Sequence, residues 1–198
     1  MDKILFLFEY NFLSIFKPLT LDLGFNLILI AILVFLSAMI SGSEVAFFSL
    51  SVANKKDLSE SNNINSLRII QLLENPKKLL ATILIANNFI NVAIVMLSTV
   101  IVEKSFDNNE LSGYAQFFIQ VIAVTFIILL FGEVIPKIYA NKFNLKFSRI
   151  MALPLSFISI IFKPISSVLV SSTSIIDKRY KKKTNSISVD ELEHALDL

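Results

Sequence analysis

Polar residues interrupt three long apolar segments of this sequence, and their side chains are the ones that could do chemistry. The interruptions fall at residues 37–44, 87–91 and 132–136. An ionisable side chain inside a membrane-spanning segment costs about 2.5–3.5 kcal/mol on insertion scales, so such side chains must face one another or water. The polar residues and glycines concerned are Ser37, Ser41, Gly42, Ser43, Glu44, Asn87, Asn88, Asn91, Gly132 and Glu133.

The spacing of these residues predicts which of them share a helix face. Ser37, Ser41 and Glu44 stand at i, i+4 and i+7, which places them on one face. The asparagines of the second interruption can also put two amides on one face. The spacings 87/91 and 88/91 both allow this, so which of the first two asparagines joins Asn91 stays open.

Two glycines and a proline predict local irregularity of the backbone. Gly42 and Gly132 mark places where a backbone can open or approach a neighbour closely. Pro136 has no N–H, so it frees the carbonyl group four residues earlier, at Gly132. Irregular backbone is tolerated in a membrane where it is buried in protein or lines a cavity. The freed carbonyl therefore becomes a candidate ligand next to Glu133.

All of these candidate ligands are oxygen atoms, from carboxylate, amide, hydroxyl and backbone carbonyl groups. The sequence has no cysteine, and its one histidine, His194, lies near the end of the chain outside the apolar segments. An oxygen set suits Mg²⁺, Ca²⁺, Mn²⁺ or Na⁺ and argues against zinc, copper and iron. The absence of a nucleophile–base pair and of a histidine base in the apolar segments also argues against an intramembrane enzyme.

Structural roles compete with this interpretation. A serine in a membrane helix often bonds its own helix or packs against a small residue, and an asparagine often links two helices. Glu44 can pair with Lys77 or Lys78, and Glu133 can form an i, i+4 pair with Lys137. Both interpretations stay open at the level of single residues.

The elements that carry these residues are predicted to be membrane-spanning helices. The chain of 198 residues is 55% hydrophobic and 17% charged, with four glycines, whereas a soluble domain has roughly a quarter charged residues. Its mean hydropathy is +0.71. Spanning helices are expected at residues 23–50, 79–102 and 114–135, each long enough for the ~20 residues that cross a bilayer. The predicted fold class is an all-α integral membrane protein with three transmembrane helices.

A fourth apolar stretch, residues 147–170, is predicted to be a kinked juxtamembrane helix in the interface. Pro154 and Pro164 break it and Lys163 lies inside it. Cytoplasmic loops carry an excess of Lys and Arg, and three spans with the N-terminus outside and the C-terminus inside place every basic cluster in the cytoplasm. A fourth span would put residues 178–183 outside. The clusters are Lys55, Lys56, Arg68, Lys77, Lys78, Lys137, Lys142, Lys146, Arg149, Lys178, Arg179, Lys181, Lys182 and Lys183.

The two ends of the chain are interpreted separately. Residues 1–20 are expected to form an amphipathic lead-in to the first span. Ser188 and Glu191 form a capping box, so we expect a soluble helix to begin there and a cytoplasmic domain to follow. The basic run at 178–183 is interpreted as anchoring to membrane lipid headgroups rather than nucleic-acid binding.

The three interruptions together resemble the CorC/CNNM (cyclin M) family transmembrane domain. The motifs read SAMISGSEVAFFSL at 37–50, LLATILIANNFIN at 79–91 and FGEVIPK at 131–137. The family usually has Gly-Asn-Asn in the second motif, and Ala86 replaces that glycine here. All three motifs occur in order on successive predicted helices over about residues 20–198, and the combination is specific where any one motif would be weak.

The resemblance implies a transporter or exporter of Mg²⁺, a divalent cation, coupled to Na⁺ and acting as a homodimer in a bacterial-type inner (plasma) membrane. It implies a transmembrane domain with a juxtamembrane belt helix over 21–176 and the start of an acidic helical bundle over 177–198. CBS domains that bind ATP would follow and are absent from this sequence. Carried across, the cation ligands are Ser37, Ser41, Asn88, Asn91, Gly132 through its carbonyl, and Glu133, with Ser43, Glu44 and Asn87 as additional candidates.

One alternative function stays open. The first motif is also compatible with a family branch associated with bacterial gliding motility, in which the chain would be a non-transporting membrane assembly component and the polar cluster would only hold helices together. The sequence does not determine the direction of transport, the coupling ion or the selectivity among divalent cations.

Overall fold

The computed structural model describes residues 21–61, 63–105 and 113–172, and these ranges are almost entirely helical with no strand. The predicted all-α fold class is therefore confirmed. The lead-in at 1–20 and the tail at 177–198, which includes the capping box, His194 and the C-terminal basic run, lie outside the described residues.

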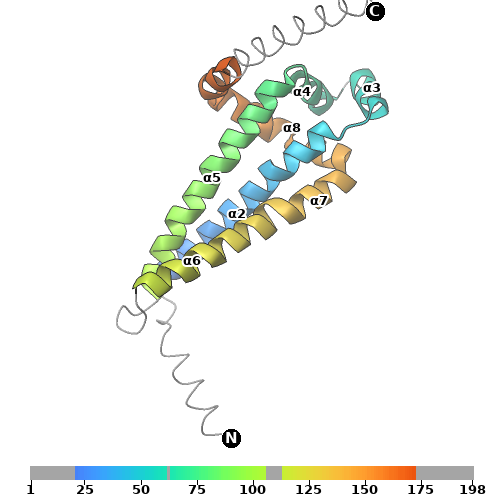
Figure 1. Ribbon diagram of the computed structural model, residues 1–198. Helices are drawn as coiled ribbons and strands as arrows, with labels where there is room; N and C mark the ends of the chain where they lie inside the picture. Colours follow the sequence, from blue (N-terminus) through green and yellow to red (C-terminus); the bar gives the residue numbers. More distant parts are fainter. Residues whose placement is uncertain (1–20, 62, 106–112, 173–198) are drawn as a thin grey trace, which may run out of the picture.

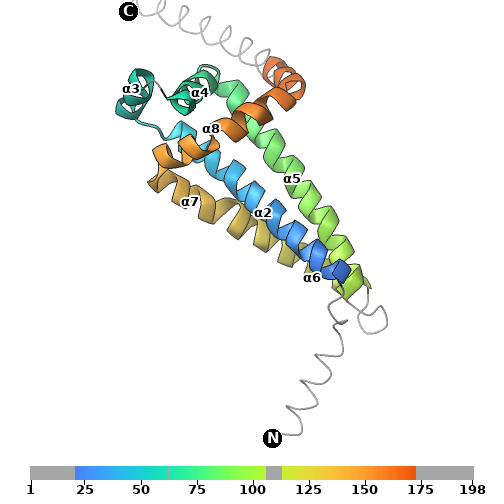
Figure 2. The same cartoon turned by 180° about the vertical axis from the view of Figure 1, so that it is seen from behind.

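Three long helical stretches form the body of the molecule. They are α2 (Leu21–Phe48), α5 (Pro76–Ser105) and a third stretch made of α6 (Gly113–Ile127), the π-helix η1 (Ile128–Val134) and α7 (Ile135–Lys142). Figures 1 and 2 show that the three stretches meet where α6 begins and spread apart toward the end of α7. The predicted spans at 23–50, 79–102 and 114–135 correspond to these stretches.

Two short helices lie at the wide end of this wedge, the polar α3 (Val52–Glu60) and the more apolar α4 (Ile64–Leu73). Their starts follow from the sequence. The Ser51 side chain accepts a hydrogen bond from the backbone N–H of Asn54, and the Asn63 side chain accepts one from that of Asn65. Such caps satisfy N–H groups that the first turn of a helix cannot pair internally.

The buried apolar core also lies at the wide end. Side chains of α2, α3, α4, α5, α7 and α8 (Asn144–Ile161) pack together there, and the fully buried ones include Phe47, Leu58, Ile69, Ile83 and Leu155. The first half of α2 and most of α6 instead expose large apolar side chains such as Phe25, Phe117 and Ile122. Apolar surface of this kind is suited to lipid.

Four helical stretches in the described ranges are long and apolar enough to cross a membrane, one more than the three predicted. The additional one is α8, which has 18 residues and the lowest mean hydropathy of the four, 1.3. It is the predicted juxtamembrane helix, and length and composition alone do not separate an interfacial helix from a span. Figures 1 and 2 show α8 crossing the wide end of the wedge from the end of α7 toward the start of α5, rather than running along the other long helices.

The expected break at Pro154 is wrong. Helix α8 continues through Pro154 and ends at Ile161, and residues 163–172 are helical again. Pro164 lies in the first turn of this next helical segment, where a missing N–H costs little because no carbonyl is waiting for it. The interruption therefore falls between the two prolines, at Phe162.

Candidate cation site

Ser37 and two asparagines bring α2 and α5 together halfway along the wedge. The Ser37 Oγ lies 3.0 Å from the Asn87 Oδ1 and 2.8 Å from the Asn91 Oδ1, and Ser37 is fully buried. A hydroxyl has one proton, so it can donate to only one of the two amide oxygens at a time. The two amide oxygens therefore share the single hydroxyl proton of Ser37.

Glu133 adds a carboxylate to this cluster from η1. The side-chain amides of Asn87 and Asn91 both donate to its Oε1, at 3.4 Å each. Within the described ranges no basic side chain forms an ion pair with Glu133. Among the described residues, its carboxylate has these two long amide hydrogen bonds, although a carboxylate among apolar helices normally requires a cationic partner.

The π-helix accounts for the position of Glu133. Residues 128–134 have π geometry, and the backbone N–H of Ile135 bonds the Leu130 carbonyl five residues earlier. Such π-bulges are rare and often occur at functional sites. Pro136, which has no N–H, lies in the first turn of α7, directly after the π-helix. The irregular backbone predicted from Gly132 and Pro136 is therefore confirmed.

Gly132 allows the close approach of η1 to α2. It is buried, and a Cβ atom added there would lie 3.2 Å from the Ser37 Oγ and 3.6 Å from its Cβ. This separation is tighter than nearly all real Cβ contacts. The hydroxyl of Ser37 therefore lies against bare backbone next to Glu133.

Two further serines of α2 behave differently from each other. Ser41 follows Ser37 by one turn, is 2% exposed, and its Oγ has no hydrogen-bond partner among the described residues. Leaving a buried hydroxyl unpaired costs about 1–3 kcal/mol, so Ser41 is available to a ligand. The Ser43 Oγ instead donates to the Met39 carbonyl at 2.7 Å, which is the structural role that competes for such serines.

The structure places Asn87, rather than Asn88, in the cluster. Asn88 is exposed, on a face of α5 that points away from Ser37 and Glu133. Successive residues on an α-helix are separated by about 100°, so two adjacent asparagines cannot both face one point. Of the two asparagines that the sequence left open, the structure brings Asn87 to the cluster beside Asn91, at i and i+4, and leaves Asn88 outside it; the ligand set itself stays a prediction.

Glu44 does not join the cluster and does not pair with the expected lysines. Its Oε2 lies 3.0 Å from the Nζ of Lys137. Lys137 thus forms an ion pair with a residue of α2, although the sequence also allowed an i, i+4 pair between Lys137 and Glu133. This ion pair links α2 to α7 at the wide end, one to two turns from Ser37 and Glu133.

The arrangement can hold a hard cation. Hydroxyl, amide and carboxylate oxygens converge from α2, α5 and η1, and Ser41 lies beside them. The described residues contain no group of three or more His, Cys, Asp or Glu side chains, so any cation held here would depend on neutral oxygens together with the single carboxylate of Glu133.

A second polar contact between helices, not predicted from the sequence, joins α5 and α6. The Gln120 Nε2 of α6 lies 2.8 Å from the Thr99 Oγ1 and 3.2 Å from the Ser98 Oγ of α5. A glutamine inside a strongly apolar helix was the available signal. The contact is a neutral interhelical hydrogen bond of the kind that links membrane helices.

The matches to known proteins agree with this architecture. Residues 28–198 match the family described as the Cyclin M transmembrane N-terminal domain, CNNM. The chain belongs to the CNNM family. The match includes all three polar motifs and the described helices from the eighth residue of α2 onward, and together with the spanning helices it indicates a multi-pass membrane protein.

Several relatives of this CNNM chain come from distant organisms. The inner membrane protein YfjD of Escherichia coli is 28% identical over 162 residues, 79% of this chain and 36% of YfjD. A UPF0053 protein of Haemophilus influenzae is 37% identical over 113 residues, 57% of this chain and 26% of its own length. The metal transporter cnnm-4 of Caenorhabditis elegans is 26% identical over 169 residues, 80% of this chain and 35% of cnnm-4. The chain thus spans about a third of the length of these relatives.

Proposed function

We propose that this chain is the transmembrane part of a Mg²⁺ transporter and that the cluster around Glu133 binds the transported ion. One observation carries the proposal: a carboxylate without a cationic partner in the described structure lies among hydroxyl and amide oxygens from three helices. The name of the relative cnnm-4, a metal transporter, agrees with this.

The chain's residues would bind the ion by replacing its hydration water. Mg²⁺ requires six oxygens in an octahedral arrangement and gives up water reluctantly. Glu133 supplies the charge, and the oxygens of Ser37, Asn87 and Asn91 supply neutral ligands. Ser41 has a buried hydroxyl to offer without breaking another bond. The Gly132 carbonyl completes the proposed set.

Release of the ion requires these ligands to separate. They belong to α2, α5 and η1, so a small movement of α2 against η1 would open the set. The Ser37 hydroxyl lies close to the Gly132 backbone, so this contact would change in such a movement. For coupling to Na⁺, the same oxygen ligands would bind Na⁺, an ion with a lower charge than Mg²⁺.

The membrane context proposed is a homodimer in an inner (plasma) membrane, with the wide end in the cytoplasm. The basic residues of the described ranges support this orientation, because Lys55, Lys56, Lys77, Lys78 and Lys142 all belong to the elements at the wide end.

Titration calorimetry on the purified chain tests the proposal. Glu133→Gln removes the charge and keeps the shape, and the affinity for Mg²⁺ should fall by about 100-fold or more, since even outer-sphere changes cost 10–100-fold. Glu60→Gln, on the exposed surface of α3, is the matched control and should leave binding unchanged. Mg²⁺ flux into liposomes should follow binding. Full binding and flux by Glu133→Gln would refute the proposal.

A specific observation favours a second candidate, a non-transporting assembly component. Ser37, Asn87, Asn91 and Glu133 already bond one another, as helix-linking residues would. In that case Mg²⁺ should not raise the melting temperature of the purified chain, and Glu133→Gln should destabilise it with or without Mg²⁺. A transporter site predicts stabilisation that grows with Mg²⁺ concentration.

A further inference from the structure

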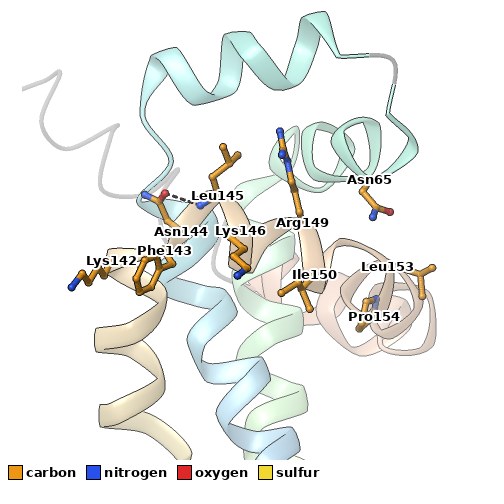
Figure 3. A pocket seen from close by; sticks show the side chains of 10 residues that line it. All are labelled: Asn65, Lys142, Phe143, Asn144, Leu145, Lys146, Arg149, Ile150, Leu153 and Pro154. Carbon is orange, nitrogen blue, oxygen red and sulfur yellow. Dashed lines mark hydrogen bonds between the residues drawn. The ribbon is translucent and has the colours of Figure 1, made fainter.

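An open groove of about 850 Å³ lies where α7 turns into α8, at the wide end of the molecule. Figure 3 shows its lining side chains, which come from the end of α7, the first half of α8 and one residue of α4, Asn65. The groove is separate from the cluster around Glu133, and none of the cluster's residues line it.

Three cations line the groove, and no acidic residue does. Lys142, Lys146 and Arg149 are all exposed. No acidic side chain of 21–61, 63–105 or 113–172 forms an ion pair with them. In Figure 3, Arg149 extends toward α3 and α4 while Lys146 leaves α8 on another side. The lining of the groove therefore carries three positive charges and no negative one.

Apart from Asn65 and Asn144, the remaining lining residues of the groove are apolar. Phe143, Ile150 and Leu153 line it and are each at least 43% exposed. The apolar face continues along α8 through Phe157 and Ile160, which are 64% and 70% exposed. The spacing 150, 153, 157, 160 is that of one helix face. A small soluble anion would use the cations but would leave this apolar face in water.

We infer that this groove binds the headgroup of an anionic phospholipid, with the headgroup attracted by the basic side chains of the lining and the acyl chains along the exposed face of α8. Charge and apolar surface occur together there, which matches an amphiphile with a negative head. Figure 1 shows α8 at the wide end of the molecule, beside α3 and α4, which is the end that carries the basic residues. The inference does not depend on the proposed cation site.

Native mass spectrometry of the full chain in detergent tests the inference with dioleoyl-phosphatidylglycerol, and with dioleoyl-phosphatidylcholine for comparison. Each basic residue near a membrane surface contributes about fivefold in affinity, so Lys146→Gln with Arg149→Gln should weaken phosphatidylglycerol binding by about 25-fold. Lys55→Gln with Lys56→Gln, on α3, makes the same change in net charge outside the groove and should have little effect. Equal losses in both pairs would overturn the inference.

Further arms separate the lipid from other anions. Ile150→Ser with Leu153→Ser keeps every charge and should also weaken phosphatidylglycerol binding, and both side chains are exposed, so the fold should tolerate the change. Inorganic phosphate should not displace the lipid at millimolar concentration. Displacement by phosphate would assign the groove to a soluble anion, and displacement by an acidic peptide of residues 188–198 would assign it to a protein segment. Either result overturns the inference.

Discussion

Asn87 and Asn88 are neighbours in the sequence, yet only the first contacts the cluster around Glu133. Replacing each with leucine separates a ligand from an adjacent amide of the same type. Asn87→Leu should lower Mg²⁺ affinity by at least about tenfold, because it removes one oxygen ligand and one donor to the carboxylate. Asn88→Leu should leave the affinity unchanged in titration calorimetry. A larger loss with Asn88→Leu would mean that α5 is rotated when the ion binds.

Gly132 gives a second test at the residue scale. A methyl group there would press on the Ser37 Oγ, so Gly132→Ala should displace that hydroxyl and weaken Mg²⁺ binding by roughly tenfold. Gly24→Ala is the matched control, because a Cβ at Gly24 meets nothing within 4 Å, and alanine stabilises a helix by about 1 kcal/mol relative to glycine. Binding isotherms and melting curves of both variants should show lost affinity only in Gly132→Ala.

At the scale of elements, one glycine determines how α8 lies on α2. A Cβ at Gly42 would be 2.7 Å from the Phe147 Cζ and 3.3 Å from the Pro136 carbonyl oxygen. The amide of Asn144 also donates to the Ser49 carbonyl at 2.9 Å, which fixes the start of α8 to the end of α2. Helix α8 is therefore held against α2, the helix that carries Ser37 and Ser41, through both side-chain and backbone contacts.

Gly42→Ala should therefore destabilise the chain by about 1–3 kcal/mol through overpacking, which corresponds to a fall of several degrees in melting temperature. Adding Phe147→Leu should recover part of this loss, since it shortens the side chain that the methyl group meets. The double-mutant cycle measures the coupling. Additive losses from the two substitutions would show that the contact does not limit the approach of α8.

At the scale of the whole molecule, the chain offers a direct test of how often it crosses the membrane. It has no cysteine, so single cysteines can be labelled without background. Ser59→Cys on α3 and Ser172→Cys after α8 should react with an impermeant thiol reagent from the same side, and Asn108→Cys from the other. If Ser172→Cys instead reacts from the side of Asn108→Cys, α8 is a fourth span and the interfacial interpretation is wrong.

The sequence alone determined the fold class and the three stretches that carry the polar motifs. Hydropathy, length and the scarcity of glycine are local properties, and a bilayer leaves few alternatives to a helix. The irregularity at Gly132 and Pro136 was also visible, because a proline removes a donor wherever it stands. The sequence predicted three membrane-spanning helices, and the described residues contain four candidates. The difference is α8, which has the length of a span and a composition between that of a span and that of an interfacial helix.

Only the tertiary structure decided which polar residues meet. Periodicity fixes the angles among residues on one helix, but it does not fix how that helix is rotated against its neighbours. Because of that rotation Asn87, and not Asn88, contacts Ser37. For the same reason Lys137 forms its ion pair with Glu44 rather than with Glu133. The rotation also left Ser41 unpaired and brought Ser37 against Gly132. These outcomes depend on packing between helices far apart in the chain, and no single segment of sequence contains that information.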